Sequence, residues 1–144
     1  MRRCTLDTNI ISAFLENDLE VVKKISDYLE VFDDLTINII SYYEILRGLK
    51  DLGNTDKLRK FEEFIQENEL ISIRKETVQK ASEIYAYLKR GGILVEDADI
   101  LMASIALVED LVLVTDNARH FERVKDLEIE NCKKRNIKGC RKDS

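Results

Sequence analysis

Four short segments of the chain carry side chains that are suited to binding a cation. Asp7 directly follows a short apolar run, Arg3–Leu6, and precedes a helical pattern. Glu44, Asp99 and the pair Asp116-Asn117 stand at the starts of later elements. The carboxyl ends of parallel strands, and the helices that follow them, open onto one edge of an α/β sheet. These side chains are therefore predicted to share a cleft.

A cluster of carboxylates at one edge persists only if its charge is offset. Two unit charges about 4 Å apart cost roughly 4 kcal/mol at an effective dielectric constant near 20. A bound cation removes this repulsion, and hard oxygen ligands select Mg²⁺ or Mn²⁺. Helix N-termini at the same edge favour an anionic phosphate. The pattern therefore predicts a metal-dependent phosphodiesterase site.

Each of these positions also has a local structural explanation. Asp7 suits the N-cap of a helix, and Ser41-Tyr42-Tyr43-Glu44 has the form of a capping box. Asp97 and Asp99 suit the first turn of an apolar helix, and Asp116-Asn117 suits a turn. Capping explains each residue separately. Only a shared site explains why all of them fall at one predicted edge.

Short β-like runs alternate with helical patterns along the chain. We predict strands at Arg3–Leu6, Leu35–Ile40, Leu70–Ile73, Leu111–Thr115 and Leu127–Glu130. Apolar residues recur at helical spacing from Leu19 to Phe32, from Leu58 to Ile65, from Val78 to Leu88 and from Ile100 to Val108. The alternation predicts an α/β fold in which a parallel sheet lies between helices.

The length and composition are those of one soluble domain. A chain of 144 residues forms a single domain with a substantial core. No apolar run approaches the roughly 20 residues of a membrane span, and no signal-peptide stretch follows Arg2-Arg3. We therefore expect a soluble, cytoplasmic protein. Its three cysteines, Cys4, Cys132 and Cys140, lack a zinc-binding spacing and are expected to be free thiols.

Charge is distributed unevenly. The net charge is −5, yet the segment 133–144 contains six basic residues and one acid, so the tail carries +5 and the remaining body −10. This basic tail is suited to binding phosphates through counterion release. The alternative is a solvated, partly disordered terminus. An acidic body does not forbid nucleic-acid binding when metal ions occupy its acidic cleft.

The chain resembles the PIN-domain ribonucleases, and most of all the VapC-type toxins of bacterial and archaeal toxin–antitoxin pairs. Four segments carry the resemblance, in the family's order and spacing: Leu6-Asp7-Thr8-Asn9, Ser41-Tyr42-Tyr43-Glu44-Ile45-Leu46-Arg47-Gly48, Glu96-Asp97-Ala98-Asp99-Ile100-Leu101-Met102-Ala103-Ser104 and Leu113-Val114-Thr115-Asp116-Asn117-Ala118-Arg119-His120-Phe121. The resemblance implies a three-layer α/β/α fold over residues 1–132. Its five-stranded parallel sheet would have the order 3-2-1-4-5.

The resemblance also implies which residues form the site. Asp7, Glu44 and Asp99 match the three family acids. Asn117 matches the fourth position, and adjacent Asp116 is an alternative source of charge. The implied cofactor is Mg²⁺, or else Mn²⁺, held most directly by Asp7 and Asp99. Further candidate ligands are Glu44, Asp116 and Asp97.

Several neighbouring residues are given other roles. His120 is not needed as a general base, and its segment, Arg119-His120-Phe121, is expected to serve packing. Glu122 is expected to be exposed. Tyr42 and Tyr43 are assigned to the core or an interface in preference to stacking on a base.

The resemblance further implies partners. It favours single-stranded or looped RNA as the substrate, a small antitoxin protein as an inhibitor, and a homodimer. Apolar side chains of the early helices appear in excess of what one small core needs, which agrees with a dimer: Leu19, Val22, Leu29 and Phe32.

Other classes of protein remain as alternatives. A receiver-type or other flavodoxin-like binding module also has acids at strand ends. A receiver, however, has an acidic pair after its first strand and a Lys after its last, whereas this chain has one acid, Asp7, followed by Thr8-Asn9, and no such Lys. A haloacid-dehalogenase phosphatase has Asp-x-Asp at its first strand, where this chain has Asn9 in place of the second acid. Within the PIN family, an RNA-processing nuclease without an antitoxin is the second interpretation.

Overall fold

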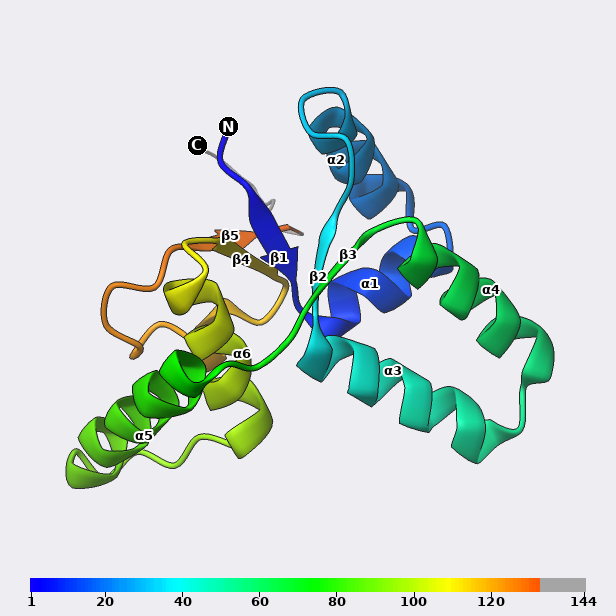
Figure 1. Cartoon of the computed structure of the whole chain (residues 1–144). Coiled ribbons are helices and arrows are strands. Elements are labelled where there is room, and N and C mark those ends of the chain that lie inside the picture. Colours follow the sequence, from blue (N-terminus) through cyan, green and yellow to red (C-terminus); the bar gives the residue numbers. More distant parts are fainter. Residues whose placement is uncertain (133–144) are drawn as a thin grey trace.

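The computed structural model describes residues 1–132, in which strands alternate with helices (Figure 1). The strands are β1 (Cys4–Leu6), β2 (Thr36–Asn38), β3 (Glu69–Ile71), β4 (Val112–Thr115) and β5 (Ile129–Asn131). The helices are α1 (Thr8–Leu15), α2 (Leu19–Leu29), α3 (Ile39–Leu52), α4 (Thr55–Gln66), α5 (Lys75–Arg90), α6 (Asp97–Val108) and the short 3₁₀ helix η1 (Ala118–His120). The basic tail, 133–144, and its Cys140 lie outside the described residues.

The five strands form one parallel sheet in the order β3-β2-β1-β4-β5. This confirms the predicted fold class and strand order. The registers place Leu6 of β1 opposite Val114 of β4, and Thr5 opposite Thr36 of β2. The central strand β1 therefore ends between its neighbours, and the residue that follows it, Asp7, lies at the middle of the carboxyl edge.

The second strand is shorter than the sequence predicts, because a helix begins inside the predicted run Leu35–Ile40. Asn38 is the N-cap of α3, and its side-chain oxygen accepts a hydrogen bond from the Ser41 N–H at 2.8 Å. Its amide nitrogen donates to the Leu6 carbonyl at 3.0 Å. The predicted capping box that begins at Ser41 is therefore wrong, and Glu44 is free for another role.

Helices cover both faces of the sheet and bury two separate apolar clusters. Alternation along β4 shows the division, because Val114 belongs to the cluster beneath α1 and α2, whereas Leu113 belongs to the cluster beneath α5 and α6. Phe61 of α4 completes the first cluster, and Met102 of α6 the second. Large buried side chains on both faces hold the sheet rigid, so the site at its edge rests on a fixed platform.

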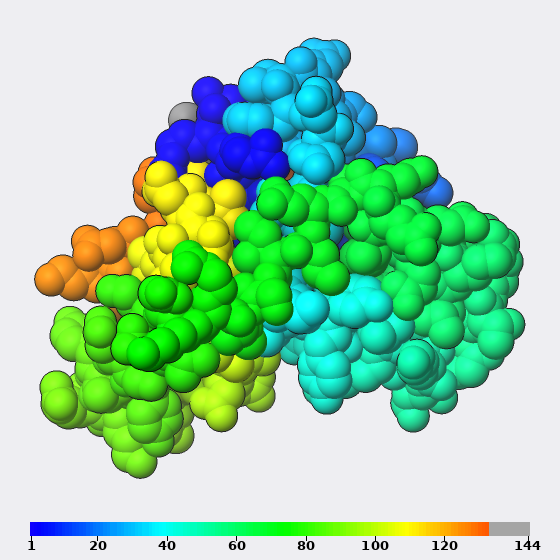
Figure 2. Space-filling model, in the orientation of Figure 1, coloured from blue at the N-terminus to red at the C-terminus, as the bar shows by residue number. Residues whose placement is uncertain are grey.

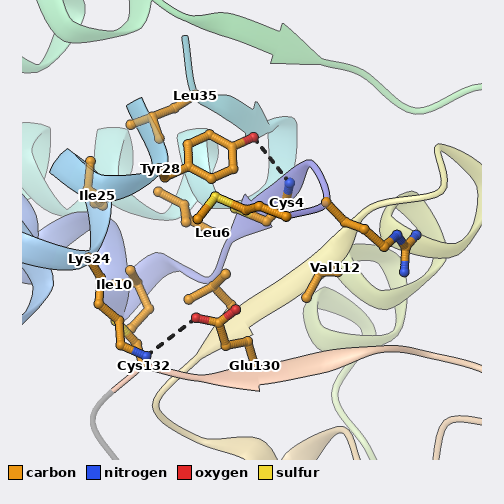
Figure 3. Close-up of a pocket in the computed structure, with 13 residues that line it drawn as sticks. Cys4, Leu6, Ile10, Lys24, Ile25, Tyr28, Leu35, Val112, Glu130 and Cys132 are labelled. Atoms are coloured by element: carbon orange, nitrogen blue, oxygen red, sulfur yellow. Dashed lines mark hydrogen bonds and ion pairs between the residues drawn. The ribbon is translucent and has the colours of Figure 1, made fainter. Parts of the chain in front are cut away.

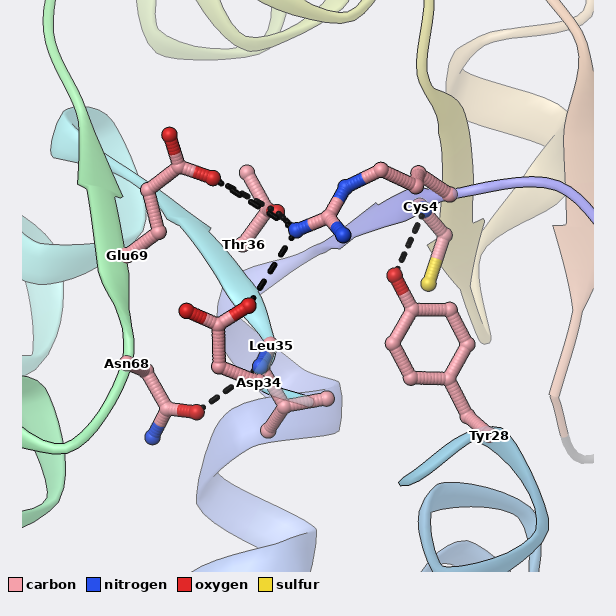
Figure 4. Close-up of polar contacts among 8 residues, drawn as sticks. Cys4, Tyr28, Asp34, Leu35, Thr36, Asn68 and Glu69 are labelled. Carbon is pink, nitrogen blue, oxygen red and sulfur yellow. Dashed lines mark hydrogen bonds and ion pairs between the residues drawn. The ribbon is translucent and has the colours of Figure 1, made fainter. Parts of the chain in front are cut away.

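The amino edge of the sheet is held together by one arginine. One guanidinium nitrogen of Arg3 lies 3.2 Å from a carboxylate oxygen of Asp34, 3.0 Å from the Thr36 hydroxyl and 3.5 Å from Glu69 (Figure 4). These contacts join β1 to β2 and β3. Exposed ion pairs of this kind contribute little to stability individually, so they fix strand alignment more than they add free energy.

A small cavity lies beside this edge, between α2 and the strands β1, β4 and β5. It has a volume of about 170 Å³, and its lining includes the free cysteines Cys4 and Cys132 and the ring of Tyr28 (Figure 3). The Tyr28 hydroxyl accepts the Cys4 N–H at 3.3 Å. Burial raises the pKa of the Cys4 thiol to about 12, so this thiol stays protonated and unreactive. The expectation of free thiols is confirmed for these two residues.

The opposite, carboxyl edge opens into a notch. Figure 2 shows it between the lobe formed by α5 and α6 and the lobe formed by α3 and α4. In Figure 1, β1 runs toward this notch, and α3 begins beside it. No helix in residues 1–132 has the length and apolar character that crossing a membrane requires.

Candidate active site

Asp7 is fixed at the end of β1 by hydrogen bonds from two sides. Its backbone N–H donates to the Val114 carbonyl at 2.9 Å, which continues the pairing of β1 with β4. One carboxylate oxygen accepts the Thr8 N–H at 2.7 Å and so caps α1, and the other accepts the Thr115 hydroxyl at 2.7 Å. The side chain is therefore held in one orientation at the carboxyl end of β1.

Asp7 is also a buried acid, with 8% of its surface exposed. Burial raises its pKa above the ordinary aspartate value, the hydrogen bonds from Thr115 and Thr8 lower it, and the neighbouring charges of Asp116 and Glu44 raise it again. In residues 1–132, no Lys, Arg or His forms an ion pair with this carboxylate. A buried acid with acidic neighbours and no cationic partner is a site of unfavourable charge.

Glu44 lies on the second turn of α3 and faces Asp7 across the start of α1. The hydroxyl of Thr8 is at short hydrogen-bond distance from one Glu44 carboxylate oxygen, and it also lies 3.2 Å from the Ser41 hydroxyl. The other carboxylate oxygen is 4.0 Å from the Arg47 guanidinium, at the limit of an ion pair. Thr8 therefore links Glu44 to the segment that carries Asp7.

Asp99 comes from the first turn of α6, on the opposite side of the notch. Its side chain is 20% exposed. Burial raises its pKa, the charge of Asp7 raises it further, His120 lowers it, and Glu96 and Glu44 add smaller increases. The charges of Asp7 and Glu44 both act on this carboxyl, so the structure brings Asp7, Glu44 and Asp99 near one another.

Asn117 and His120 form the remaining wall. The Asn117 N–H donates to the Thr115 hydroxyl at 2.9 Å, and its side-chain nitrogen lies 3.1 Å from a ring nitrogen of His120. That same ring nitrogen is 3.4 Å from an Asp99 carboxylate oxygen. The expectation that His120 serves packing is wrong, since its side chain is 58% exposed and faces the acids. Phe121, in contrast, is buried in the core as expected.

The other candidates have different surroundings. Asp116 lies next to the cluster and acts on Asp7 through its charge. Asp97 is exposed at the first turn of α6, and Glu122 is exposed, as predicted. Tyr42 packs against the Phe61 ring, with 5.7 Å between ring centroids, while Tyr43 is 55% exposed beside Arg47. Core packing is therefore confirmed for Tyr42 alone.

Two threonines of the site, Thr8 and Thr115, were not predicted from the sequence, and each contributes a hydroxyl group. Thr115 links Asp7 to Asn117, and Thr8 links Asp7 to Glu44. A signal for both was present, because each threonine stands directly next to a candidate acid in the sequence. Their donated hydrogen bonds orient the carboxylate oxygens that a cation would use.

The donor set fits Mg²⁺ better than an ion that needs a complete protein cage. In residues 1–132, no three His, Cys, Asp or Glu side chains are arranged to hold a metal ion by themselves. Mg²⁺ is usually bound through one or two carboxylates, keeps several waters, and takes further oxygens from a substrate phosphate. Asp7 and Asp99 carry hard oxygen donors of the kind that such a site uses.

Comparison with known proteins identifies the group to which this architecture belongs. The family model described as the PIN domain matches residues 4–127. This chain belongs to the PIN-domain family. Ribonuclease VapC1 of Methanocaldococcus jannaschii is 33% identical over 102 residues, which cover 71% of this chain and 73% of that protein. The tRNA(fMet)-specific endonuclease VapC of Salmonella typhimurium is 29% identical over 132 residues, covering 91% and 98%.

Solved structures of PIN proteins support the same assignment. DNA-bound VapBC from Salmonella typhimurium contains a chain with a TM-score of 0.79 and 29% identity, covering 90% of this chain and 98% of that one. VapBC-1 from nontypeable Haemophilus influenzae gives a TM-score of 0.78 at 25% identity, with the same coverage. The predicted resemblance to VapC-type PIN proteins is therefore confirmed, and these relatives support a nuclease.

Proposed function

We propose that this PIN-domain protein is a metal-dependent endoribonuclease that uses Mg²⁺, with Mn²⁺ as an alternative, and that it is the toxin of a toxin–antitoxin pair. The observation that carries the catalytic part is Asp7, a buried acid that has no cationic partner within residues 1–132 and that interacts electrostatically with Asp99 and Glu44. A bound divalent ion would offset this charge. The names of the VapC relatives support RNA as the substrate.

In this proposal, each residue of the site has its own role. Asp7 and Asp99 would hold the ion, and Glu44 would either bind it through water or orient the attacking water molecule. Thr115 and Thr8 hold the carboxylates of Asp7 and Glu44 in place. When bound, the ion supplies charge neutralisation for the phosphate and lowers the pKa of water. Asn117 presents its amide at the same wall, beside the place where a phosphate would bind.

The toxin role is supported by the VapBC structures in which similar chains occur. Chains of the same fold occur in VapBC structures, at 29% identity for Salmonella typhimurium and 25% for Haemophilus influenzae. We propose that a small basic antitoxin inserts an Arg or Lys side chain among Asp7, Glu44 and Asp99, because a guanidinium binds carboxylates bidentately. Its apolar segment would lie in a groove over the early helices.

We also propose a cytoplasmic homodimer. Among the apolar side chains of the early helices, Leu19 is 83% exposed and Leu29 is 40% exposed, whereas Val22 and Phe32 are partly buried. Two of the four side chains are thus available for a partner surface. An RNA-processing nuclease without an antitoxin is the second candidate, since the same site would serve either role.

The experiment for the catalytic part compares RNA cleavage by the purified chain with and without Mg²⁺. Asp7→Asn and Asp99→Asn are expected to abolish cleavage, while Asp51→Asn, at an exposed position of α3 far along the helix from Glu44, retains it. Wild-type cleavage by either site variant, or full activity in excess chelator, would show that the assigned site is wrong.

The toxin part is tested by co-expression with the neighbouring reading frame. The chain alone is expected to arrest growth, and its small partner to restore growth and co-purify with it. If the chain alone is harmless and no small protein co-purifies, the toxin role fails and the nuclease role stands.

A further inference from the structure

A second cavity adjoins the acid cluster on the side of Asp99. It has a volume of about 570 Å³ and lies between the loop that leads into α6 and the turn that follows β4. Asp99 and His120 line its inner end, where they meet the proposed catalytic site. A cavity of this size is within the range of small-ligand sites. One of the residues that line it, Asp99, is a candidate metal ligand.

The two long walls of this cavity differ in chemistry. One is the loop from Gly92 to Val95, whose Ile93, Leu94 and Val95 side chains are apolar. The other consists of η1 and the turn after it, which contribute Arg119, His120, Glu122 and Arg123. Leu94 is 92% exposed, so its side chain contacts almost nothing else in the described protein. Apolar side chains and two arginines in one cavity match a nucleotide, which has an apolar base face and an anionic phosphate, although Glu96, Asp99 and Glu122 also line it.

The arginines of this cavity are available to a ligand. Most arginines of residues 1–132 form ion pairs with carboxylates: Arg2, Arg3, Arg47, Arg59 and Arg74. Arg119 and Arg123 form none within the described chain, although Glu96 and Glu122 line the same cavity. Their guanidinium groups are therefore free to bind a phosphate bidentately.

We propose that this cavity is a nucleotide-binding subsite for the RNA strand, in which Arg119 and Arg123 bind the phosphate that flanks the scissile one and the loop 92–95 contacts its ribose and base. The inference rests on the proposed ribonuclease function and names the part of the substrate that this side of the site holds. It commits to single-stranded RNA, because a base in a duplex is stacked and paired and does not present its face to a protein wall.

The direction of the strand follows from a shared residue. Arg123 also lines a third cavity, of about 280 Å³, together with Lys80, Lys125, Tyr87 and two acids, Glu83, which pairs with Lys80 at 3.5 Å, and Asp126. Tyr87 is 62% exposed, and an aromatic ring beside cations is suited to stacking a further base. A strand that left the catalytic acids past Arg119 and then Arg123 would continue toward α5.

The test measures binding of a fluorescein-labelled uridine 12-mer by the full chain, in an Asp7→Asn background that prevents cleavage. The double variant Arg119→Gln/Arg123→Gln is expected to bind about tenfold more weakly at 0.1 M salt. Its slope of log affinity against log salt concentration should fall by about 0.7, which is the contribution of one phosphate contact to a single strand. Arg119→Lys/Arg123→Lys should restore most of the slope.

One further variant tests the apolar wall of the cavity by itself, and another controls for the change in total charge. Leu94→Asn should weaken binding without changing the salt slope, because it removes an apolar contact and no charge. Lys57→Gln/Lys75→Gln removes two exposed lysines on α4 and at the start of α5, neither of which forms an ion pair within residues 1–132 or lines either cavity. This control should bind like the parent.

The outcomes distinguish the inference from the function on which it rests. If Asp7-intact protein cleaves RNA but the arginine variant binds like the lysine control, the subsite is wrong and the ribonuclease function stands. If the variant keeps its RNA affinity but loses a co-purified protein partner, the cavity is a protein interface and the inference is overturned. Failure of the parent to bind the 12-mer also overturns it, and failure of wild-type cleavage removes the function itself.

Discussion

At the scale of single residues, the site is built around a carboxylate in an unfavourable place. Asp7 is buried and surrounded by acids, and its pKa is raised by burial first and by Asp116 and Glu44 in addition. The protein keeps it there because the N–H of Thr8 and the hydroxyl of Thr115 hold it toward the notch. Under the proposed function, a bound cation would offset part of this unfavourable charge.

The first prediction concerns Asp7 and stability. Replacing it with Asn removes charge from the cluster, so Asp7→Asn should melt at the same temperature as the parent or higher in metal-free buffer, while cleavage is lost. Differential scanning calorimetry in chelator measures this. Melting well below the parent would show that the Asp7 charge stabilises the metal-free fold.

The pH dependence of that stability has a definite sign. The folded pKa of Asp7 is raised, so the folded state binds a proton more tightly than the unfolded state between the ordinary aspartate pKa and the raised one. The unfolding free energy therefore falls as pH rises through this window, and Asp7→Asn should remove that part of the slope. Urea unfolding of parent and variant across the acidic range tests the difference.

Thr115 is predicted to act through Asp7. The change Thr115→Val keeps the shape of the side chain but removes the hydroxyl that donates to Asp7 at 2.7 Å and accepts from Asn117 at 2.9 Å. Residues that orient metal ligands typically contribute about 10–100-fold in metal affinity or activity. We expect cleavage to fall by that amount, with a raised Mg²⁺ requirement, and Thr115→Ser to retain most activity. Equal losses for Val and Ser would contradict this role.

At the scale of elements, the start of α3 links the fold to the site. Asn38 is fully buried, caps α3 and donates to the Leu6 carbonyl and to the Thr5 hydroxyl, so it joins β2 to β1 directly beneath the acids. Glu44 is positioned by this helix. The geometry of Glu44 therefore depends on a buried carboxamide that takes no part in the chemistry.

The contribution of Asn38 to stability can be measured by comparing it with a second helix N-cap. Asn38→Ala removes an N-cap and leaves buried polar groups of β1 without a partner, at a cost of about 2–4 kcal/mol. Asn54 is the N-cap of α4, and its side-chain oxygen accepts a hydrogen bond from the Lys57 N–H at 3.1 Å in an exposed setting. Asn54→Ala should therefore cost only about 1 kcal/mol. Urea denaturation measures both. Similar costs for the two variants would show that the buried bonds of Asn38 contribute little.

The sequence predicted the elements and their order well, because apolar alternation and helical spacing report which faces are buried. The strand order came from the resemblance and is confirmed by the structure. The gathering of Asp7, Glu44 and Asp99 was predicted from their positions at strand ends and helix starts, and in the structure the charges of Asp7 and Glu44 act on Asp99. The boundary at Asn38 was missed, because an asparagine in an apolar run has no periodic signal of its own. His120 was misplaced for a related reason, since periodicity places Phe121 in the core but says nothing of which neighbour a polar ring meets.

At the scale of the whole molecule, the sheet divides the protein into two apolar clusters with the acids between them. Asp7 and Glu44 belong to the side of α1 and α3, and Asp99 to α6 on the other side. Contacts between α3 and α6 close the notch at its base. The site is therefore assembled only when both halves are folded.

The oligomeric prediction belongs to this scale. We expect sedimentation at micromolar concentration to give twice the 16.7 kDa mass of the chain, because Leu19 and Leu29 expose apolar surface on one helix. A single 16.7 kDa species would argue against a homodimer. Leu19→Glu identifies whether α2 contributes to the contact.

Asp7 also has a practical consequence for anyone who screens this protein with small molecules. A proton, a divalent ion or an inhibitory cationic side chain at this carboxylate would relieve the same electrostatic repulsion and so raise the melting temperature. Thermal-shift assays would thus report an activator and an inhibitor with the same sign. A compound that stabilises the protein must be classified by whether it competes with Mg²⁺ for the site.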